Sequence, residues 1–259
     1  MSDLTPYQKL VLDRYLARKN TETEEPEVKA DLKPKRTRKP KSSVTTSQGF
    51  NLSDYLILDG RTHGTYSYPD LLVARELSKK GNNWTDTQTE LHNEGSYMLP
   101  IRQFADFLIM LQSGKVYDGT GSQLRSQEVT KLLNNIIEVR DPWRSEWLDA
   151  KFSKQNDQFR ITYHKIKQDG TLEKVTESLE DCLITDKQPG IDLSSWLTNG
   201  TNQGLPKKST SDGSTWYWSP RDGAVARFYA NASWAGLYCD RGPNGSDGSL
   251  GVRIVRKKI

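Results

Sequence analysis

The stretch that decides the fold lies near the end of the chain and reads Ala224-Val-Ala-Arg-Phe-Tyr-Ala-Asn-Ala-Ser-Trp-Ala-Gly-Leu-Tyr-Cys-Asp240. Successive side chains of an extended strand point to opposite faces, so alternate residues from Ala224 to Ala232 share one face. The alternation slips by one residue at Ser233-Trp234, after which alternate residues from Ala235 to Cys239 continue the same face. A slip of one residue predicts a bulge or a turn at this point.

The two faces of this stretch differ in chemistry. The inward face is small, apolar and uniform, as a tightly packed scaffold requires. The outward face, which starts at Val225, mixes Arg, Tyr, Asn, Ser, Trp and Asp side chains without a common property. Tyr, Trp, Ser, Gly, Asn and Arg are favoured in antibody paratopes, because they combine rigid amphipathic area with adaptable hydrogen bonding. Residues 241–249 continue the mixture as an expected loop, and residues 250–255 follow as an expected closing strand.

Three short motifs in this region resemble a known family: Ala226-Arg-Phe228, Leu237-Tyr-Cys239 and Leu250-Gly-Val-Arg253. Together they resemble the variable region of proteins diversified by diversity-generating retroelements. Those proteins have a C-type lectin fold related to the formylglycine-generating enzymes, and adenine-directed mutagenesis rewrites chosen codons near the end of their genes. The resemblance covers about residues 194–258. It implies a hypervariable region at about residues 224–253 on a C-type-lectin-like scaffold.

The resemblance and the alternation together imply a set of variable residues that would bind a ligand. They are Arg227, Tyr229, Asn231, Ser233, Trp234, Gly236, Tyr238, Asp240, Arg241, Gly242, Asn244, Gly245, Ser246, Asp247 and Ser249. Gly236 and Gly242 have a plainer interpretation as backbone requirements, and Trp234 and Tyr238 have one as partly buried core residues. Trp216 and Trp218 are expected in the core rather than in a ligand platform.

The beginning of the chain has a different composition. Residues 1–48 combine a short amphipathic stretch with a linker in which seven basic residues outnumber two acidic ones between Glu27 and Lys41. That excess is larger than the net charge of +4 of all 259 residues, so the remaining chain is nearly neutral. A segment this polar cannot bury enough apolar surface to fold, so we expect a flexible basic tether. Binding to nucleic acid or to an acidic surface is the alternative.

Residues 49–142 are expected to form a helical N-terminal region. The pattern from Asp70 to Lys80 predicts a helix that Gly81 ends. The clearest helix is predicted for residues 98–111, where Pro100 suits the first turn and apolar residues recur at helical spacing. Another helix is predicted for residues 123–139.

From Trp143 the apolar period changes to two, and residues 143–259 are expected to form the C-type-lectin-like domain. Asp169-Gly170 lies between two such runs and predicts a hairpin turn. Helices followed by a mainly β region indicate an α+β fold with a disordered basic linker in front of it.

No catalytic or metal-binding constellation is evident in the sequence. The formylglycine-generating enzymes use a pair of reactive cysteines near the C-terminus, whereas this chain has only Cys182 and Cys239. The alternation places Cys239 inward, where a thiol is usually inert. The three histidines lack the spacing of zinc ligands, and Gly242-Pro-Asn244 lacks the acidic residue of calcium-dependent lectins. The sequence therefore favours a binding protein without a cofactor over an enzyme, with a formylglycine-generating-type oxidase as the minor alternative.

We expect a ligand-binding protein whose partner is a protein or a cell-surface molecule. Tyr229, Trp234 and Tyr238 would supply hot-spot area, and the charged members of the set would supply charge complementarity. A fixed receptor-binding or structural component of a virion or surface assembly is the alternative. The sequence shows neither a membrane-length apolar run nor a signal peptide, so cytoplasmic location is the default expectation, with virion or surface association left open.

Overall fold

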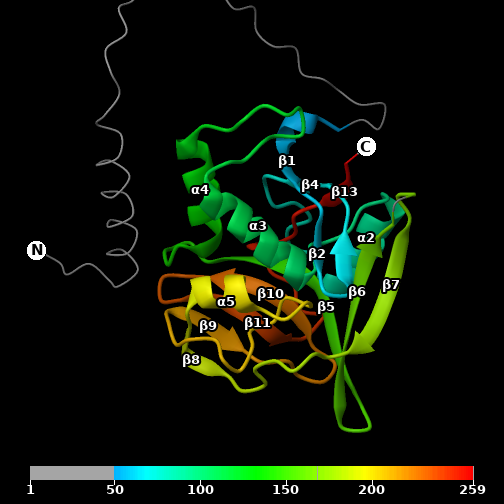
Figure 1. Cartoon of the computed structure of the whole chain (residues 1–259), viewed down its shortest axis with the longest axis vertical. Coiled ribbons are helices and arrows are strands. Elements are labelled where there is room, and N and C mark those ends of the chain that lie inside the picture. Colours follow the sequence, from blue (N-terminus) through cyan, green and yellow to red (C-terminus); the bar gives the residue numbers. More distant parts are fainter. Residues whose placement is uncertain (1–49, 168, 259) are drawn as a thin grey trace, which may run out of the picture. The chain divides into compact units, whose positions relative to one another are not determined.

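The computed structural model describes residues 50–167 and 169–258, which form a mixed α+β arrangement of four α-helices and three sheets (Figure 1). The short helix and basic linker expected in residues 1–48 lie outside the described residues. The helices are α2 (Trp84–Asn93), α3 (Ile101–Ser113), α4 (Ser126–Ile137) and α5 (Leu193–Asn199), and the 3-10 turn η1 (Leu52–Asp54) precedes them. None of these helices has the length and apolar character needed to cross a bilayer.

The large sheet is mixed, and its main path runs in the order β7-β6-β5-β10-β11-β9-β8. The strands are β5 (Arg144–Gln155), β6 (Gln158–Ile166), β7 (Leu172–Ser178), β8 (Lys187–Ile191), β9 (Thr215–Trp218), β10 (Val225–Ala230) and β11 (Ala235–Arg241). The short β12 (Leu250–Gly251) pairs with β5. The β9–β11 and β12–β5 pairs are parallel and the others are antiparallel.

Two smaller sheets contain the first four strands of the described chain. One joins β1 (Tyr55–Leu58), β4 (Leu71–Ala74) and β13 (Val255–Lys257), and the other is the hairpin of β2 (Arg61–His63) and β3 (Tyr66–Tyr68). The helix predicted for Asp70–Lys80 is therefore wrong. All four residues of β4 are buried between β1 and β13, and a continuous apolar run of this length suits a central strand as well as a helix.

Several local predictions are confirmed by the structure. Helix α3 begins three residues after the start of its predicted range, 98–111, and ends two residues beyond it. Helix α4 lies inside its predicted range, 123–139. Gly114 ends α3 in the left-handed conformation. The Asp169-Gly170 turn joins β6 to β7, and the slip near Ser233-Trp234 is the turn between β10 and β11. Helix α2 was not predicted, although Asn83 caps its first turn by accepting a hydrogen bond from Asp86 N.

The inward face of β10 packs against the helices. The Phe228 ring lies 5.2 Å from Phe104 of α3 and stacks near Trp196 of α5, with ring centroids 6.5 Å apart. The neighbouring inward residues from Ala224 to Ala230 and from Ala235 to Cys239 are also buried. The expected pattern differs at four positions: the outward residues Val225, Gly236 and Tyr238 are buried, Tyr238 with 8% of its surface exposed, and Ala232 is exposed in the turn.

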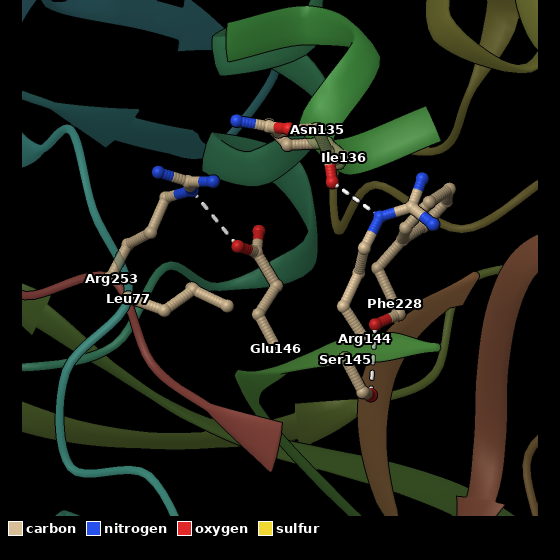
Figure 2. A pocket seen from close by; sticks show the side chains of 8 residues that line it. All are labelled: Leu77, Asn135, Ile136, Arg144, Ser145, Glu146, Phe228 and Arg253. Atoms are coloured by element: carbon tan, nitrogen blue, oxygen red, sulfur yellow. Dashed lines mark hydrogen bonds and ion pairs between the residues drawn. The ribbon is translucent and has the colours of Figure 1, made fainter. Parts of the chain in front are cut away.

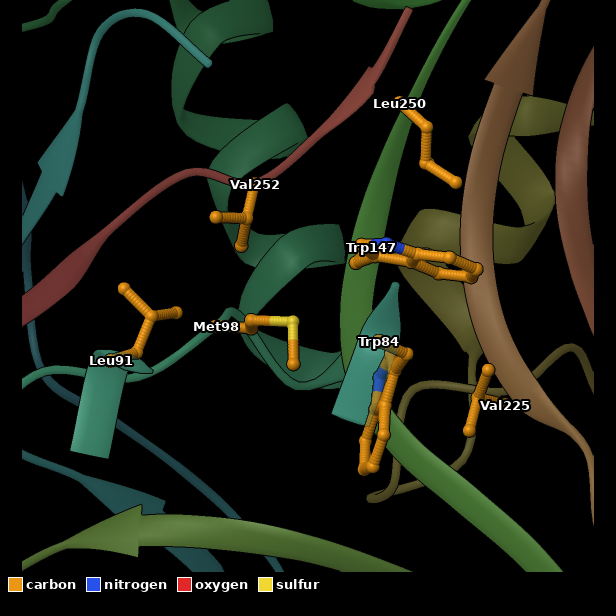
Figure 3. Close-up of a cluster of buried hydrophobic side chains, with 7 residues drawn as sticks. All are labelled: Trp84, Leu91, Met98, Trp147, Val225, Leu250 and Val252. Atoms are coloured by element: carbon orange, nitrogen blue, oxygen red, sulfur yellow. The ribbon is translucent and has the colours of Figure 1, made fainter. Parts of the chain in front are cut away.

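The burial of Val225 has a clear cause. It belongs to a buried cluster built around Trp84 and Trp147 that also includes Leu91, Met98, Leu250 and Val252 (Figure 3). Both indoles are also hydrogen-bonded, with Trp84 Nε1 donating to Leu148 O at 2.8 Å and Trp147 Nε1 to Asn82 O at 3.2 Å. Helix α2 and the last strands therefore cover one end of β10, which removes Val225 from the outward set.

The Leu250-Gly-Val-Arg253 ending closes the structure through a buried ion pair. Arg253 Nε lies 2.9 Å from Glu146 Oε2 of β5, and both side chains are almost fully buried beside a small cavity that α4 also lines (Figure 2). Arg253 also donates hydrogen bonds to the carbonyl oxygens of Ala74, the last residue of β4, and of Arg75. The Arg253 side chain therefore links the end of the chain to the large sheet and to the sheet of β1, β4 and β13.

Candidate binding surface

The outward residues of β9, β11 and β10 lie side by side in two rows set by strand register. One row is Trp218, Tyr238 and Arg227, and the next is Trp216, Gly236 and Tyr229. This face is opposite to the one that packs on α3 and α5. The alternation seen in the sequence therefore places Arg227, Tyr229 and Tyr238 together.

Each aromatic residue of the candidate set packs against a tryptophan from outside residues 224–253. The pairs are Trp234 on Trp216 (ring centroids 4.5 Å apart, planes at 11°), Tyr238 on Trp218 (3.7 Å, 20°) and Tyr229 near Trp143 (5.6 Å, 32°). We call these six residues the aromatic surface. Such contacts add about 0.5–1.5 kcal/mol per pair beyond the burial of area, so the rings hold one another in place.

Polar contacts tie the aromatic surface together. Trp234 Nε1 donates a hydrogen bond to the Tyr238 hydroxyl at 2.6 Å, and Trp216 lies 5.3 Å from Trp218. The Arg227 guanidinium lies over the rings of Tyr229 and Tyr238, at 4.9 Å and 5.0 Å from their centroids. The surface is therefore ordered before any ligand arrives, which lowers the entropic cost of binding.

Trp216 and Trp218 correct the sequence interpretation, which placed them in the core. Both are only partly buried, while Thr215 before them and Tyr217 between them are buried. The four residues of β9 alternate like those of β10, and this alternation was the signal that could have placed both tryptophans on the outward face. Trp143, just before β5, carried no comparable signal.

The turn between β10 and β11 is organised by Asn231. Its side-chain oxygen accepts hydrogen bonds from Ser233 N at 2.8 Å and Trp234 N at 2.9 Å, and its amide nitrogen donates to the Tyr229 hydroxyl at 3.1 Å. Ser233 is exposed at the tip. Asn231 thus holds the backbone of Trp234, whose ring stacks on Trp216.

The loop of residues 242–249 borders this surface and contains the remaining candidate residues. Gly242, Asn244, Ser246 and Asp247 are exposed, and Gly245 and Ser249 are partly buried. The loop is held at both ends, because Pro243 O accepts from Trp84 N at 3.0 Å and Ser249 O accepts from Ser145 N at 3.1 Å. Its exposed side chains therefore sit on a fixed backbone beside the end of β11.

Gly236 differs from the other candidates. It is buried, and a Cβ built there would lie 2.2 Å from the carbonyl oxygen of Trp216 in the parallel partner strand β9. A side chain at this position would require the two strands to separate. The same construction at Gly242 meets nothing within 4 Å. Of the two glycines, only Gly242 has room for other residues.

Arg227 and Arg241 are unusual among the arginines of residues 50–258. The other ten each hydrogen-bond or ion-pair with an acceptor in this part of the chain, whereas these two have cation–π or packing contacts alone. The Nε atoms of both are buried without a hydrogen-bond partner. Burial, followed by the nearby charge of Arg241, lowers the pKa of Arg227. The two residues lie on paired strands, where Arg241 pairs with Val225, two residues before Arg227.

The two cysteines are buried free thiols that the fold brings near each other. Burial raises the pKa of Cys182 to about 11 and raises the pKa of Cys239 well above its usual range. Both thiols also contribute, after burial, to the raised pKa of the Tyr217 hydroxyl. Because the reactive form of cysteine is the thiolate, both groups are held in their unreactive form at neutral pH.

A histidine pair lies away from this surface. The rings of His92 (α2) and His164 (β6) have centroids 4.3 Å apart, and His164 Nδ1 lies 3.1 Å from the buried carboxylate of Asp149. No local sequence pattern indicates this pairing, because its members are far apart in the chain. Within residues 50–258, no group of three or more His, Cys, Asp or Glu side chains is arranged to hold a metal ion.

Comparison with known proteins gives no assignment: no protein-family model, no curated protein and no solved structure matches the chain. Its function must therefore be inferred from its own residues and geometry.

Proposed function

We propose that this protein binds a protein or cell-surface ligand through the aromatic surface and the loop of residues 242–249. In this proposal the scaffold is C-type-lectin-like, and a retroelement diversifies residues within about 224–253 by adenine-directed mutagenesis. One observation carries the proposal. Arg227, Tyr229 and Tyr238, which alternate with the inward residues in the sequence, lie together on the outward side of β10 and β11. The loop of residues 242–249, from the same segment, borders them.

The contrast between the two sides of β10 supports this proposal. Substitution on the inward side would disturb the packing of Phe228 on Phe104 and Trp196. On the other side Ser233 and Asp240 are exposed, as are Gly242, Asn244, Ser246 and Asp247 of the loop. A diversified protein needs such a division, because most substitutions in a packed core destabilise the fold. Trp, Tyr and Arg are also the residues most often found as binding hot spots.

The oxidase alternative has less support. It requires a thiolate within reach of solvent and substrate, whereas burial holds Cys182 and Cys239 protonated. A fixed receptor-binding component of a surface assembly would use the same aromatic surface, and only sequence variation distinguishes it from a diversified binder.

The experiment that tests diversification is to sequence this gene and its neighbourhood in many cells of the source population. We expect a nearby reverse-transcriptase gene and a near-copy of the segment encoding residues 224–253 that differs at adenines. The mismatches should fall on codons for exposed candidate residues and spare Gly236. An invariant segment without a second copy would leave a fixed-ligand binder and end the diversification proposal.

A display experiment tests the binding surface itself. One library of the full chain is randomised at Tyr229, Trp234, Tyr238, Asp240 and Asn244, and a matched library is randomised at inward positions of β10 and β11. Both are selected against an arbitrary folded protein such as hen lysozyme. We expect folded binders from the first library and mostly unfolded chains from the second. Comparable yields from the two libraries would contradict the proposed division of faces.

A further inference from the structure

The two arginines beside the aromatic surface point to the chemistry of the ligand. Guanidinium groups in folded proteins are normally satisfied by carboxylate or carbonyl acceptors, and a buried donor without an acceptor destabilises the protein. Arg227 and Arg241 lack such acceptors within residues 50–258, and their Nε atoms are buried. The two residues also lie on the paired strands β10 and β11, where Arg241 pairs with Val225 and Arg227 with Tyr238, so two like charges share one end of this strand pair. An anion supplied from outside would relieve both costs.

The positions of the two arginines suit a shared ligand group. Arg227 lies on β10 over the Tyr229 and Tyr238 rings, and Arg241 ends β11 opposite Val225. The Arg241 guanidinium also packs against Gly245, where an added Cβ would lie 3.0 Å from one of its terminal nitrogens. The pair therefore lies where the aromatic surface meets the loop of residues 242–249. Asp240 precedes Arg241 in the chain, and its charge favours the charged form of Arg227, but its carboxylate forms no ion pair within 4 Å among the described residues.

The stacking of the aromatic surface narrows the class of partner. Bases of single-stranded nucleic acid bind on open aromatic faces, whereas Trp216 and Trp218 already stack on Trp234 and Tyr238. Stacked rings that present edges and hydroxyls, next to arginine, are typical of hot spots in protein–protein interfaces.

We propose that the aromatic surface recognises an acidic segment of a protein partner, whose side-chain carboxylate binds between Arg227 and Arg241. This inference rests on the proposed binding function and specifies its ligand. Arginine forms short, charge-assisted and often bidentate hydrogen bonds with carboxylates, each about twice as strong as a neutral one. The aromatic rings supply area around the carboxylate and exclude water from it.

The probe is a phage-displayed library of random peptides selected on the immobilised full chain. The library is first depleted on a Trp234→Ala/Tyr238→Ala variant, which keeps residues 1–48 and so removes peptides that bind the basic linker. We expect the peptides then enriched on the unchanged chain to be rich in Asp and Glu. Their affinity should fall by about tenfold or more on an Arg227→Gln/Arg241→Gln variant, the loss expected for a charged hydrogen bond.

Matched variants separate charge from folding. Arg160→Gln removes the same charge from β6 and should leave peptide affinity unchanged, and Arg227→Lys tests whether a charge alone suffices. Near-ultraviolet circular dichroism reports whether each variant keeps its packed aromatic residues. If peptides are enriched without an acidic bias, or if folded Arg227→Gln/Arg241→Gln binds them equally well, the carboxylate proposal is overturned and the binding function stands. If, after depletion on Trp234→Ala/Tyr238→Ala, the unchanged chain enriches no peptides, the binding function fails as well.

Discussion

Gly236 and Gly242 lie six positions apart in the sequence, but the fold leaves space for a side chain only at Gly242. At Gly236 a Cβ would lie 2.2 Å from the Trp216 carbonyl oxygen, and at Gly242 it would meet nothing within 4 Å. We expect Gly236→Ala to lower the free energy of unfolding by about 3 kcal/mol, because β9 and β11 must separate. Gly242→Ala should change it by less than about 0.5 kcal/mol. Urea denaturation of both variants checks the pair, and equal stabilities would contradict the close approach at Gly236.

Asn231 has a structural task as well as a place in the candidate set. Asn231→Ala removes two hydrogen bonds to the turn backbone, at Ser233 N and Trp234 N, and should destabilise the protein by about 1–2 kcal/mol. Asn244→Ala, an exposed loop substitution, is the control and should be neutral. Denaturation midpoints measure both. A neutral Asn231→Ala would mean that the turn forms without its side chain.

Single residues show how far sequence alone could identify the candidate surface. The alternation in residues 224–240 placed Arg227, Tyr229 and Tyr238 on one face, because register along a strand is a local property. It misplaced Val225, whose burial depends on Trp84 and Trp147 from distant elements. It also could not show that Trp143 meets Tyr229, since that contact depends on how β5 pairs with β10.

At the scale of elements, helices with a clear apolar stripe were predictable and short central strands were not. The α3 and α4 stripes and the Asp169-Gly170 turn are local signals, and the structure contains all three. The run Leu71–Ala74 is too short for its period to distinguish helix from strand. Its partners β1 and β13 come from opposite ends of the described chain, so the order of the strands could not be read from local sequence.

The joint between β4, β5 and the closing residues depends on Arg253. Arg253→Met leaves Glu146 buried without its cation, which should cost about 3–5 kcal/mol. Burial raises the pKa of Glu146 and Arg253 opposes that shift, so without Arg253 the carboxyl should take up a proton more readily. The stability loss should therefore be smaller at about pH 5 than at about pH 8.

The exposed ion pair of Arg125 and Glu128 provides the control for this prediction. Arg125→Met removes a charge of the same kind at an exposed position and should leave the stability nearly unchanged, because water screens an exposed ion pair. Thermal unfolding of both variants at the two pH values makes the comparison. A loss for Arg253→Met as small as that for Arg125→Met would show that the buried pair does not hold the closing strand.

At the scale of the whole molecule, His92 should make stability depend on pH. Burial, and then the charge of His164, lower the pKa of His92, while Asp149 opposes them. The unfolded chain then binds a proton at higher pH than the folded chain does, so stability falls as the pH drops through about 6.5, the ordinary histidine value. We expect the Tm to decrease between about pH 7.5 and pH 5.5, and His92→Gln to reduce that decrease. Asn93→Gln, one residue along α2 and exposed, should leave it unchanged.

The pairing of β13 with β4 has a consequence for how errors in the gene reach the cell. The proposed variable codons all precede Arg253 and Val255–Lys257, which complete a sheet begun by Leu71–Ala74. A frameshift or stop codon introduced by mutagenesis would delete these residues and leave β4 with an open edge and Glu146 without its cation. Such a product would be recognised by proteases as unfolded, whereas missense variants would pass. Completion of the fold therefore depends on an intact reading frame through the proposed variable codons.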